Sequence, residues 1–101
     1  MYNYLLLSLV KNFRKNDETA FDMIYEEFKG LINFYARKLQ YEDATGELTL
    51  FFIELLLSNR LLKFQPDKSD SLKRYIAVSI RNKYIALSKE KQKSYNKTYC
   101  L

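Results

Sequence analysis

An apolar repeat between residues 21 and 39 constrains the fold of this chain more than any other feature. Apolar side chains recur there at i, i+3, i+4 and i+7 over about five helical turns. The repeat consists of Phe21, Ile24, Phe28, Leu31, Ile32, Tyr35 and Leu39. It predicts an amphipathic helix that ends near residue 40, with Asn16 or Asp17 as its N-cap. Other elements must cover the apolar face of this helix.

Similar spacing predicts three further helices. The first covers about residues 2–14, with one apolar side made of Leu5, Leu6, Leu9, Val10 and Phe13. A polar turn over residues 40–47, which includes Gly46, separates the second helix from a third over about 46–62. A fourth covers about 70–90, with Asp67, Ser69 or Asp70 as its N-cap. Its apolar stripe is Leu72, Ile76, Ile80, Tyr84 and Leu87.

The composition agrees with a helical protein. The 101 residues include only two Gly and one Pro, whereas a hairpin-rich fold needs more turn residues. We therefore expect an all-α fold, a small bundle of about four helices. Residues 1–93 are expected to form this domain, and residues 94–101 a flexible tail or the start of a linker.

Several kinds of chemistry are excluded by residue type. The chain has no His and a single Cys, Cys100, so it cannot form a Cys/His zinc site, a Ser-His-Asp triad or a Cys-His dyad. It also lacks a glycine-rich phosphate loop. We expect no enzymatic activity, no metal and no cofactor. The apolar runs 4–10 and 48–57 fit neither a signal peptide nor a membrane span, so we expect a cytoplasmic protein without a membrane partner.

Charge is distributed unevenly along the chain. Residues 1–50 hold six Lys/Arg and eight Asp/Glu, whereas residues 51–101 hold eleven and four, so the halves carry −2 and +7. The basic half suggests contact with a polyanion. A basic, solvated surface without a ligand is the alternative.

The third predicted helix is apolar almost all round. A small domain cannot easily bury every side of it, so part is expected in the core and part on a surface kept for a partner or for self-association. A strand over residues 48–57 is the competing interpretation, but its length and the lack of alternation weigh against it.

The fourth helix and the segment before it carry the residue types that bind nucleic acid. Arg74 and Arg81 are seven residues apart and share one helix face. Cations can neutralise phosphates, while an aromatic ring and an amide can stack on and read an unpaired base. Phe64 is also a good core candidate. The candidate nucleic-acid residues are Lys63, Phe64, Gln65, Lys68, Lys73, Arg74, Arg81, Asn82, Lys89 and Lys91.

The order of these features over residues 15–93 resembles region 2 of bacterial RNA polymerase sigma factors of the extracytoplasmic-function type. It resembles most closely the sigma factors that control toxin genes in spore-forming anaerobes. The resemblance rests on the acidic turn YEDATGE, the apolar helix LTLFFIELL, the loop LKFQPDKSD and the helix that follows them. Leu72, Tyr75 and the pair Arg81-Asn82 match the aromatic-Leu…Arg-Asn signature of that family.

The resemblance implies a fold, two partners and the residues that meet them. In the family, the helix after the acidic turn docks on the clamp helices of the polymerase β′ subunit. Here that helix begins at Glu47-Leu48, and Leu50-Phe51 replace the usual Gln-Glu pair, which implies a more apolar interface. An anti-sigma protein is a further partner of this kind of surface. The implied polymerase-binding residues are Glu47, Leu50, Phe51 and Glu54.

The family's loop before the fourth helix captures a flipped base of the −10 promoter element on the non-template strand. That loop corresponds to residues 63–71 here. Val78 and Ser79 occupy the positions where primary sigma factors have two Trp, which suggests an alternative sigma factor with a strict promoter.

The family's second helical domain, region 4, does not follow in this sequence. We therefore expect either one domain of a longer protein or a region-2-only protein. Two other functions remain open, a helical protein–protein adaptor and a general nucleic-acid-binding domain without promoter specificity.

Overall fold

The computed structural model describes residues 5–64 and 69–99, with side chains over residues 6–64 and 70–91. Within these ranges the chain forms four α-helices and one 3₁₀ helix and contains no strand. The prediction of a small all-α bundle is therefore confirmed. The competing strand over residues 48–57 is wrong, because almost all of that segment is helical.

Helix α2, Glu18–Leu39, is the element that the sequence predicted most closely. Asp17 is its N-cap, and Oδ1 of Asp17 accepts hydrogen bonds from the backbone N–H groups of Thr19 and Ala20 at 3.0 and 3.3 Å. Gln40 ends the helix in the left-handed conformation, with φ of 60°. Asn16, with φ of 72°, makes the turn from helix α1, Leu5–Arg14.

The third predicted helix, residues 46–62, is two elements. Helix α3 spans Ala44–Leu56, and the 3₁₀ helix η1 spans Asn59–Lys63. The break occurs because the hydroxyl of Ser58 accepts a hydrogen bond from the backbone N–H of Arg60 and starts a new helix. At its other end α3 begins earlier than expected, so Gly46 lies in its first turn rather than in the preceding loop.

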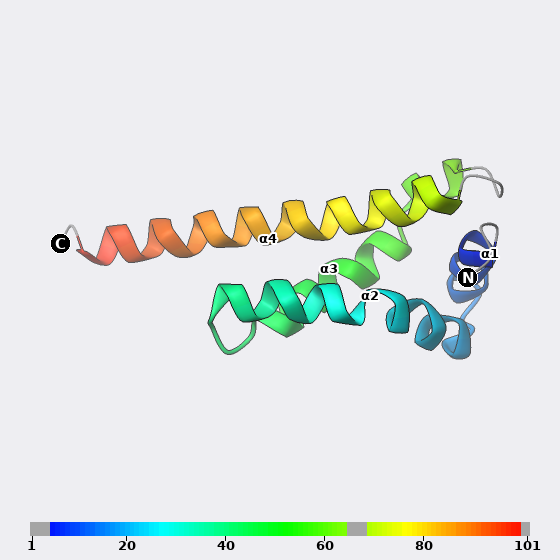
Figure 1. The fold of residues 1–101 in the computed structure, drawn as a ribbon, viewed down its shortest axis with the longest axis horizontal. Coiled ribbons are helices and arrows are strands. Elements are labelled where there is room, and N and C mark those ends of the chain that lie inside the picture. The colour runs from blue at the N-terminus through cyan, green and yellow to red at the C-terminus, as the bar shows by residue number, and fades with distance from the viewer. Residues whose placement is uncertain (1–4, 65–68, 100–101) are drawn as a thin grey trace.

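Helix α4, Ser69–Tyr99, is the longest element and continues past the predicted end near residue 90. Its 31 residues correspond to about 46 Å of helix, and it extends well beyond the other helices (Figure 1). The division into a domain of residues 1–93 and a tail stays a prediction. Asp67 lies outside the described residues.

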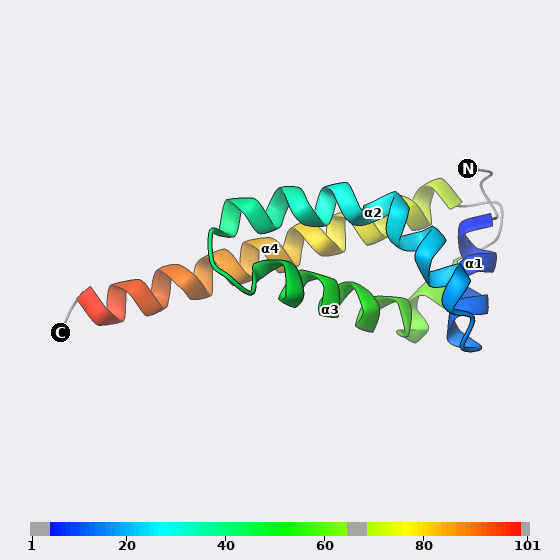
Figure 2. The same cartoon turned by 90° about the horizontal axis from the view of Figure 1, so that it is seen from below.

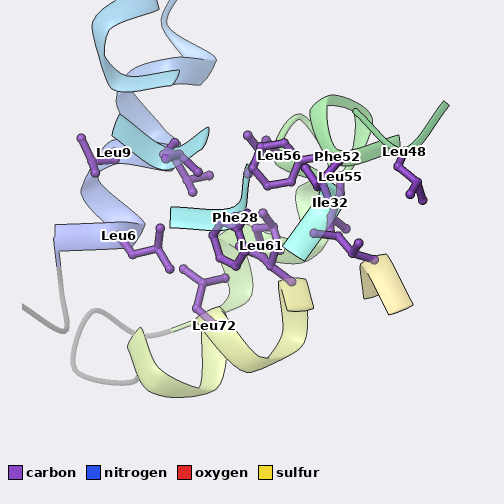
Figure 3. Packing of buried hydrophobic residues seen from close by; sticks show 14 of the residues in the cluster. Leu6, Leu9, Phe28, Ile32, Leu48, Phe52, Leu55, Leu56, Leu61 and Leu72 are labelled. Carbon is purple, nitrogen blue, oxygen red and sulfur yellow. The ribbon is translucent and has the colours of Figure 1, made fainter. Parts of the chain in front are cut away.

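The helices pack around a single core. Helix α4 runs parallel to α2 and antiparallel to α3 and contacts both (Figure 2). Helix α1 crosses the end where α2 begins (Figure 1). Figure 3 shows Phe28, Phe52 and Leu61 within this core, together with Leu72.

The predicted apolar stripes form this core. Of the α4 stripe, four residues are buried and Tyr84 is half-buried against α2. Leu7 of α1, which the spacing did not single out, is also buried, whereas Phe13 packs at the edge. The side chain of Leu5 lies outside the described residues.

Candidate nucleic-acid and protein interfaces

One face of α4 is cationic and, between residues 71 and 89, free of acids. From residue 71 to residue 89 the helix carries five Lys/Arg and no Asp/Glu. Arg74, Arg81 and Lys89 are exposed, on the side opposite the buried stripe. Within the described residues neither Arg74 nor Arg81 forms an ion pair. These guanidinium groups therefore face solvent and can meet phosphates without first losing a protein partner.

Aromatic rings line a groove at the start of this face. Phe64 and Tyr75 are half-buried, and their ring centroids are 5.4 Å apart. Together with Arg74 and Val78 they line a groove of about 460 Å³. Asp70, the acid of this groove, adds a negative charge at its rim. Two rings beside a guanidinium suit an unstacked base, because a base can pack on a ring while the cation holds its phosphate.

Helix η1 positions Phe64. Leu61 of η1 is fully buried, which anchors the segment immediately before Phe64. Arg14 of α1 donates hydrogen bonds to the backbone carbonyl of Leu57 and, at 2.9 Å, to Oδ1 of Asn59. The position of Phe64 in the aromatic groove thus depends on a contact between α1 and the α3–η1 junction.

Two of the predicted nucleic-acid residues have partners in their own fold. Lys73 forms an ion pair with Glu27 of α2 at 3.3 Å, and Lys91 donates a hydrogen bond to the backbone carbonyl of Leu39 at the end of α2. Both contacts hold α4 beside α2. Lys73 and Lys91 therefore have structural roles that sequence reasoning missed.

The remaining predicted residues are spread along the molecule. Lys63, at the end of η1, is exposed, as is Asn82. Arg81, Asn82 and Lys89 lie further along α4 and do not line the aromatic groove. Gln65 and Lys68 lie outside the described residues.

A second groove lies between α3 and α4. It has a volume of about 250 Å³ and is lined by all four residues predicted to bind the polymerase. Leu50 is 57% exposed and Glu54 is exposed, whereas Glu47 and Phe51 are half-buried. Phe51 also packs against the core, so Leu50 offers the freer apolar surface. The expectation that α3 divides between core and surface is confirmed by the burial of its residues.

The α4 wall of this groove consists of Lys83, Leu87 and Glu90. None of these residues was predicted as part of the site. Their spacing of i, i+4 and i+7 places them on one helix face and could have indicated them. Nζ of Lys83 lies 5.9 Å from the ring centroid of Phe51, which links the two walls.

Tyr41 fixes the orientation of Glu47. The tyrosine hydroxyl donates a 2.6 Å hydrogen bond to Oε2 of Glu47. Burial and this hydrogen bond raise the pKa of Tyr41 to about 12. The carboxylate of Glu47 is thereby held at the rim of the α3–α4 groove.

The two grooves lie on different sides of α4. Lys83, Leu87 and Glu90 face α3, whereas Arg74, Tyr75 and Val78 line the aromatic groove. One helix thus contributes to an acidic and apolar groove and to a cationic face. Such an arrangement can bind two different partners at the same time.

Comparison with known proteins gives no relative: no family model matches the chain, and no curated protein or solved structure is significantly similar to it. Within residues 5–64 and 69–99, no three Cys, Asp or Glu side chains lie close enough together to hold a metal ion. None of the described helices is both long and apolar enough to cross a membrane.

Proposed function

We propose that this chain is a transcription-initiation module of the sigma region 2 type. It docks on the β′ subunit of core RNA polymerase through α3 and holds the non-template strand of the −10 promoter element with α4. It acts in the cytoplasm, has no catalytic activity of its own and needs no cofactor. The observation that carries the proposal is the division of α4 between an acid-free cationic face and a groove shared with α3.

The cationic face supplies affinity for the strand. Arg74, Arg81 and Lys89 neutralise phosphates and release condensed counterions, so binding weakens as salt rises. A flipped base enters the groove that Phe64 and Tyr75 line, and the exposed part of these rings supports the proposed stacking. Unstacking a base costs a few kcal/mol, which stacking and phosphate contacts repay.

The groove between α3 and α4 supplies affinity for the polymerase. Leu50 is its most exposed apolar residue, and the three carboxylates of Glu47, Glu54 and Glu90 outweigh the single cation of the groove. This combination fits a helical partner that carries apolar residues flanked by cations. Self-association or an anti-sigma protein would use the same surface.

The experiment that tests the proposal measures both partners. Core polymerase is mixed with the tagged chain, and recovery of β′ is scored after washing. In parallel, fluorescence anisotropy follows a labelled −10 single strand and a scrambled strand, each with and without core enzyme. We expect recovery of β′ and a preference for the −10 strand that strengthens when core enzyme is present.

Each alternative function gives a different result. A general nucleic-acid-binding domain binds both strands equally and is indifferent to core enzyme. A protein adaptor binds neither strand and does not recover β′. Either result would overturn the proposed function.

A further inference from the structure

Three aromatic rings form a continuous chain from the outer surface of α2 to α4. Phe34 is 47% exposed and meets the ring of Tyr35 edge-on, with centroids 5.3 Å apart. Tyr35 in turn stacks on Tyr84 of α4 at 4.7 Å. We call Phe34, Tyr35 and Tyr84 the aromatic seam. Its outer end is the exposed ring of Phe34, which contacts Tyr35, and Tyr35 and Tyr84 are both half-buried.

Cations accompany the aromatic seam. Nζ of Lys38 lies 4.7 Å from the ring centroid of Phe34. Arg81 precedes Tyr84 by one helical turn and is exposed. From residue 28 to its end at Leu39, α2 carries three Lys/Arg and no Asp/Glu, and the neighbouring part of α4 is also free of acids. The ion pair of Lys73 with Glu27 lies nearer the start of both helices.

We propose that the aromatic seam binds single-stranded nucleic acid, with one base stacked on Phe34 and the flanking phosphates held by Lys38 and Arg81. This inference rests on the proposed function and extends its strand-binding surface from α4 onto α2. On binding, the flexible Lys38 side chain moves from the ring to a phosphate, and a base takes its place on the ring.

The chemistry of the aromatic seam favours this occupant over the others. A protein partner that docks on an apolar patch needs several exposed apolar side chains, whereas Phe34 is a single ring among cations. A duplex cannot use the ring, because its bases are stacked on each other. A single strand offers an open base face and negative charge together, which matches the ring and the cations.

The seam also sets a length requirement for the strand. Tyr75, in the aromatic groove, and Tyr84, in the seam, are nine residues apart on α4, which is about 14 Å along the helix axis. A strand too short to reach from the aromatic groove to the aromatic seam contacts only one of them. Affinity is therefore expected to rise with oligonucleotide length until both places are occupied.

The chain contains no Trp, so Phe34→Trp places a unique fluorophore in the aromatic seam and keeps an aromatic ring there. Oligothymidylate is titrated into this variant at low salt, with anisotropy of a labelled strand showing saturation. We expect quenching of Trp emission as the base stacks. The matched control is Met23→Trp, because Met23 is also on α2 and is 45% exposed, but lies eleven residues before Phe34, about 16 Å along the helix axis. Its emission should not change.

Affinity gives the second readout. Phe34→Ala should weaken binding of oligothymidylate about five- to tenfold, and Met23→Ala should leave it unchanged. Circular dichroism checks that each variant keeps its helical content. Lys38→Ala should reduce the slope of log affinity against log salt by about 0.7, the value for one phosphate contact on a single strand.

The outcomes separate this inference from the function on which it rests. Suppose that Arg81→Ala weakens binding but Phe34→Ala does not, and that Trp emission in Phe34→Trp is not quenched at saturation. Strand binding at the aromatic seam is then overturned, whereas strand binding by the cationic face of α4 is supported. If the unmodified chain binds no strand at low salt, both are overturned. Quenching of the Trp emission in Phe34→Trp, together with weaker binding of oligothymidylate by Phe34→Ala, supports strand binding at the aromatic seam.

Discussion

Tyr41 and Glu47 connect the turn after α2 to the rim of the α3–α4 groove through a 2.6 Å hydrogen bond. The folded protein keeps the tyrosine protonated, because burial and the neighbouring carboxylate raise the pKa of Tyr41 from its usual value of 10.0 to about 12. In the unfolded chain this tyrosine loses its proton near pH 10. The resulting contribution to stability is fully present below pH 10 and is lost as pH rises toward 12.

Tyr41→Phe should therefore remove part of the alkaline sensitivity of the protein. We expect the free energy of unfolding to fall by about 1 kcal/mol at neutral pH, since the hydrogen bond is lost. The difference between the two proteins should shrink between pH 10 and 12. Urea unfolding at neutral pH and between pH 10 and 12 measures the free energy of unfolding of both proteins. The contributions of the other tyrosines are the same in the two proteins and cancel in the difference. A difference that stays constant up to pH 12 would contradict the raised pKa.

Arg14→Ala should loosen the junction between α3 and η1. The substitution removes the hydrogen bonds to the carbonyl of Leu57 and to Asn59, and a loss of about 1 kcal/mol in stability is expected for a contact at the surface. Faster amide hydrogen exchange at residues 58–64 is the specific readout. Arg60→Ala, an exposed residue of η1, is the control and should change neither quantity.

Gly30→Ala should stabilise the protein. Gly30 lies in the interior of α2, and a Cβ added there meets no atom within 4 Å. Alanine loses less conformational freedom on folding, so the free energy of unfolding should rise by about 0.5–1 kcal/mol. Thermal unfolding followed by circular dichroism tests this. A lower melting temperature would show that α2 needs a glycine at this position.

Leu50→Glu tests the α3–α4 groove without disturbing the core. Leu50 is 57% exposed, so the free energy of unfolding should change by less than about 0.5 kcal/mol. A carboxylate placed in an apolar, already acidic contact should weaken recovery of β′ at least about tenfold. Met23→Glu provides an equally charged change at another exposed position and should leave recovery intact. Unfolding of Leu50→Glu would assign Leu50 to the core.

Periodicity was sufficient to predict α2 and the buried stripe of α4, because each follows an uninterrupted helical repeat. It could not place the break at Leu57 and Ser58. Leu61 and Leu62 follow the apolar run 48–57 after only three polar residues, and the cap that interrupts the helix depends on the Ser58 hydroxyl. The contact from Arg14 to Leu57 joins residues 43 apart in sequence, and no local pattern predicts such a pair.

The candidate site was predictable to a similar extent. Charge and exposure of Arg74 and Arg81 followed from their helix face, because residues opposite a buried stripe face solvent. The partners of Lys73 and Lys91 could not be predicted from the sequence. Both partners lie on α2, so these contacts depend on how α2 and α4 pack. Phe34 was also missed. It lies outside the apolar repeat of α2, and the sequence does not show that its ring contacts Tyr35.

Removing Arg81 and Lys89 together should separate nucleic-acid binding from polymerase binding. Both residues are exposed on α4 and outside the α3–α4 groove, so recovery of β′ should not change. Loss of two phosphate contacts on a single strand should reduce the slope of log affinity against log salt by about 1.4. The double substitution Lys11→Ala with Lys15→Ala removes the same charge from exposed positions at and just after the end of α1 and should leave the slope nearly unchanged. If the two double variants give equal slopes, binding responds to net charge alone and α4 has no cationic face for a strand.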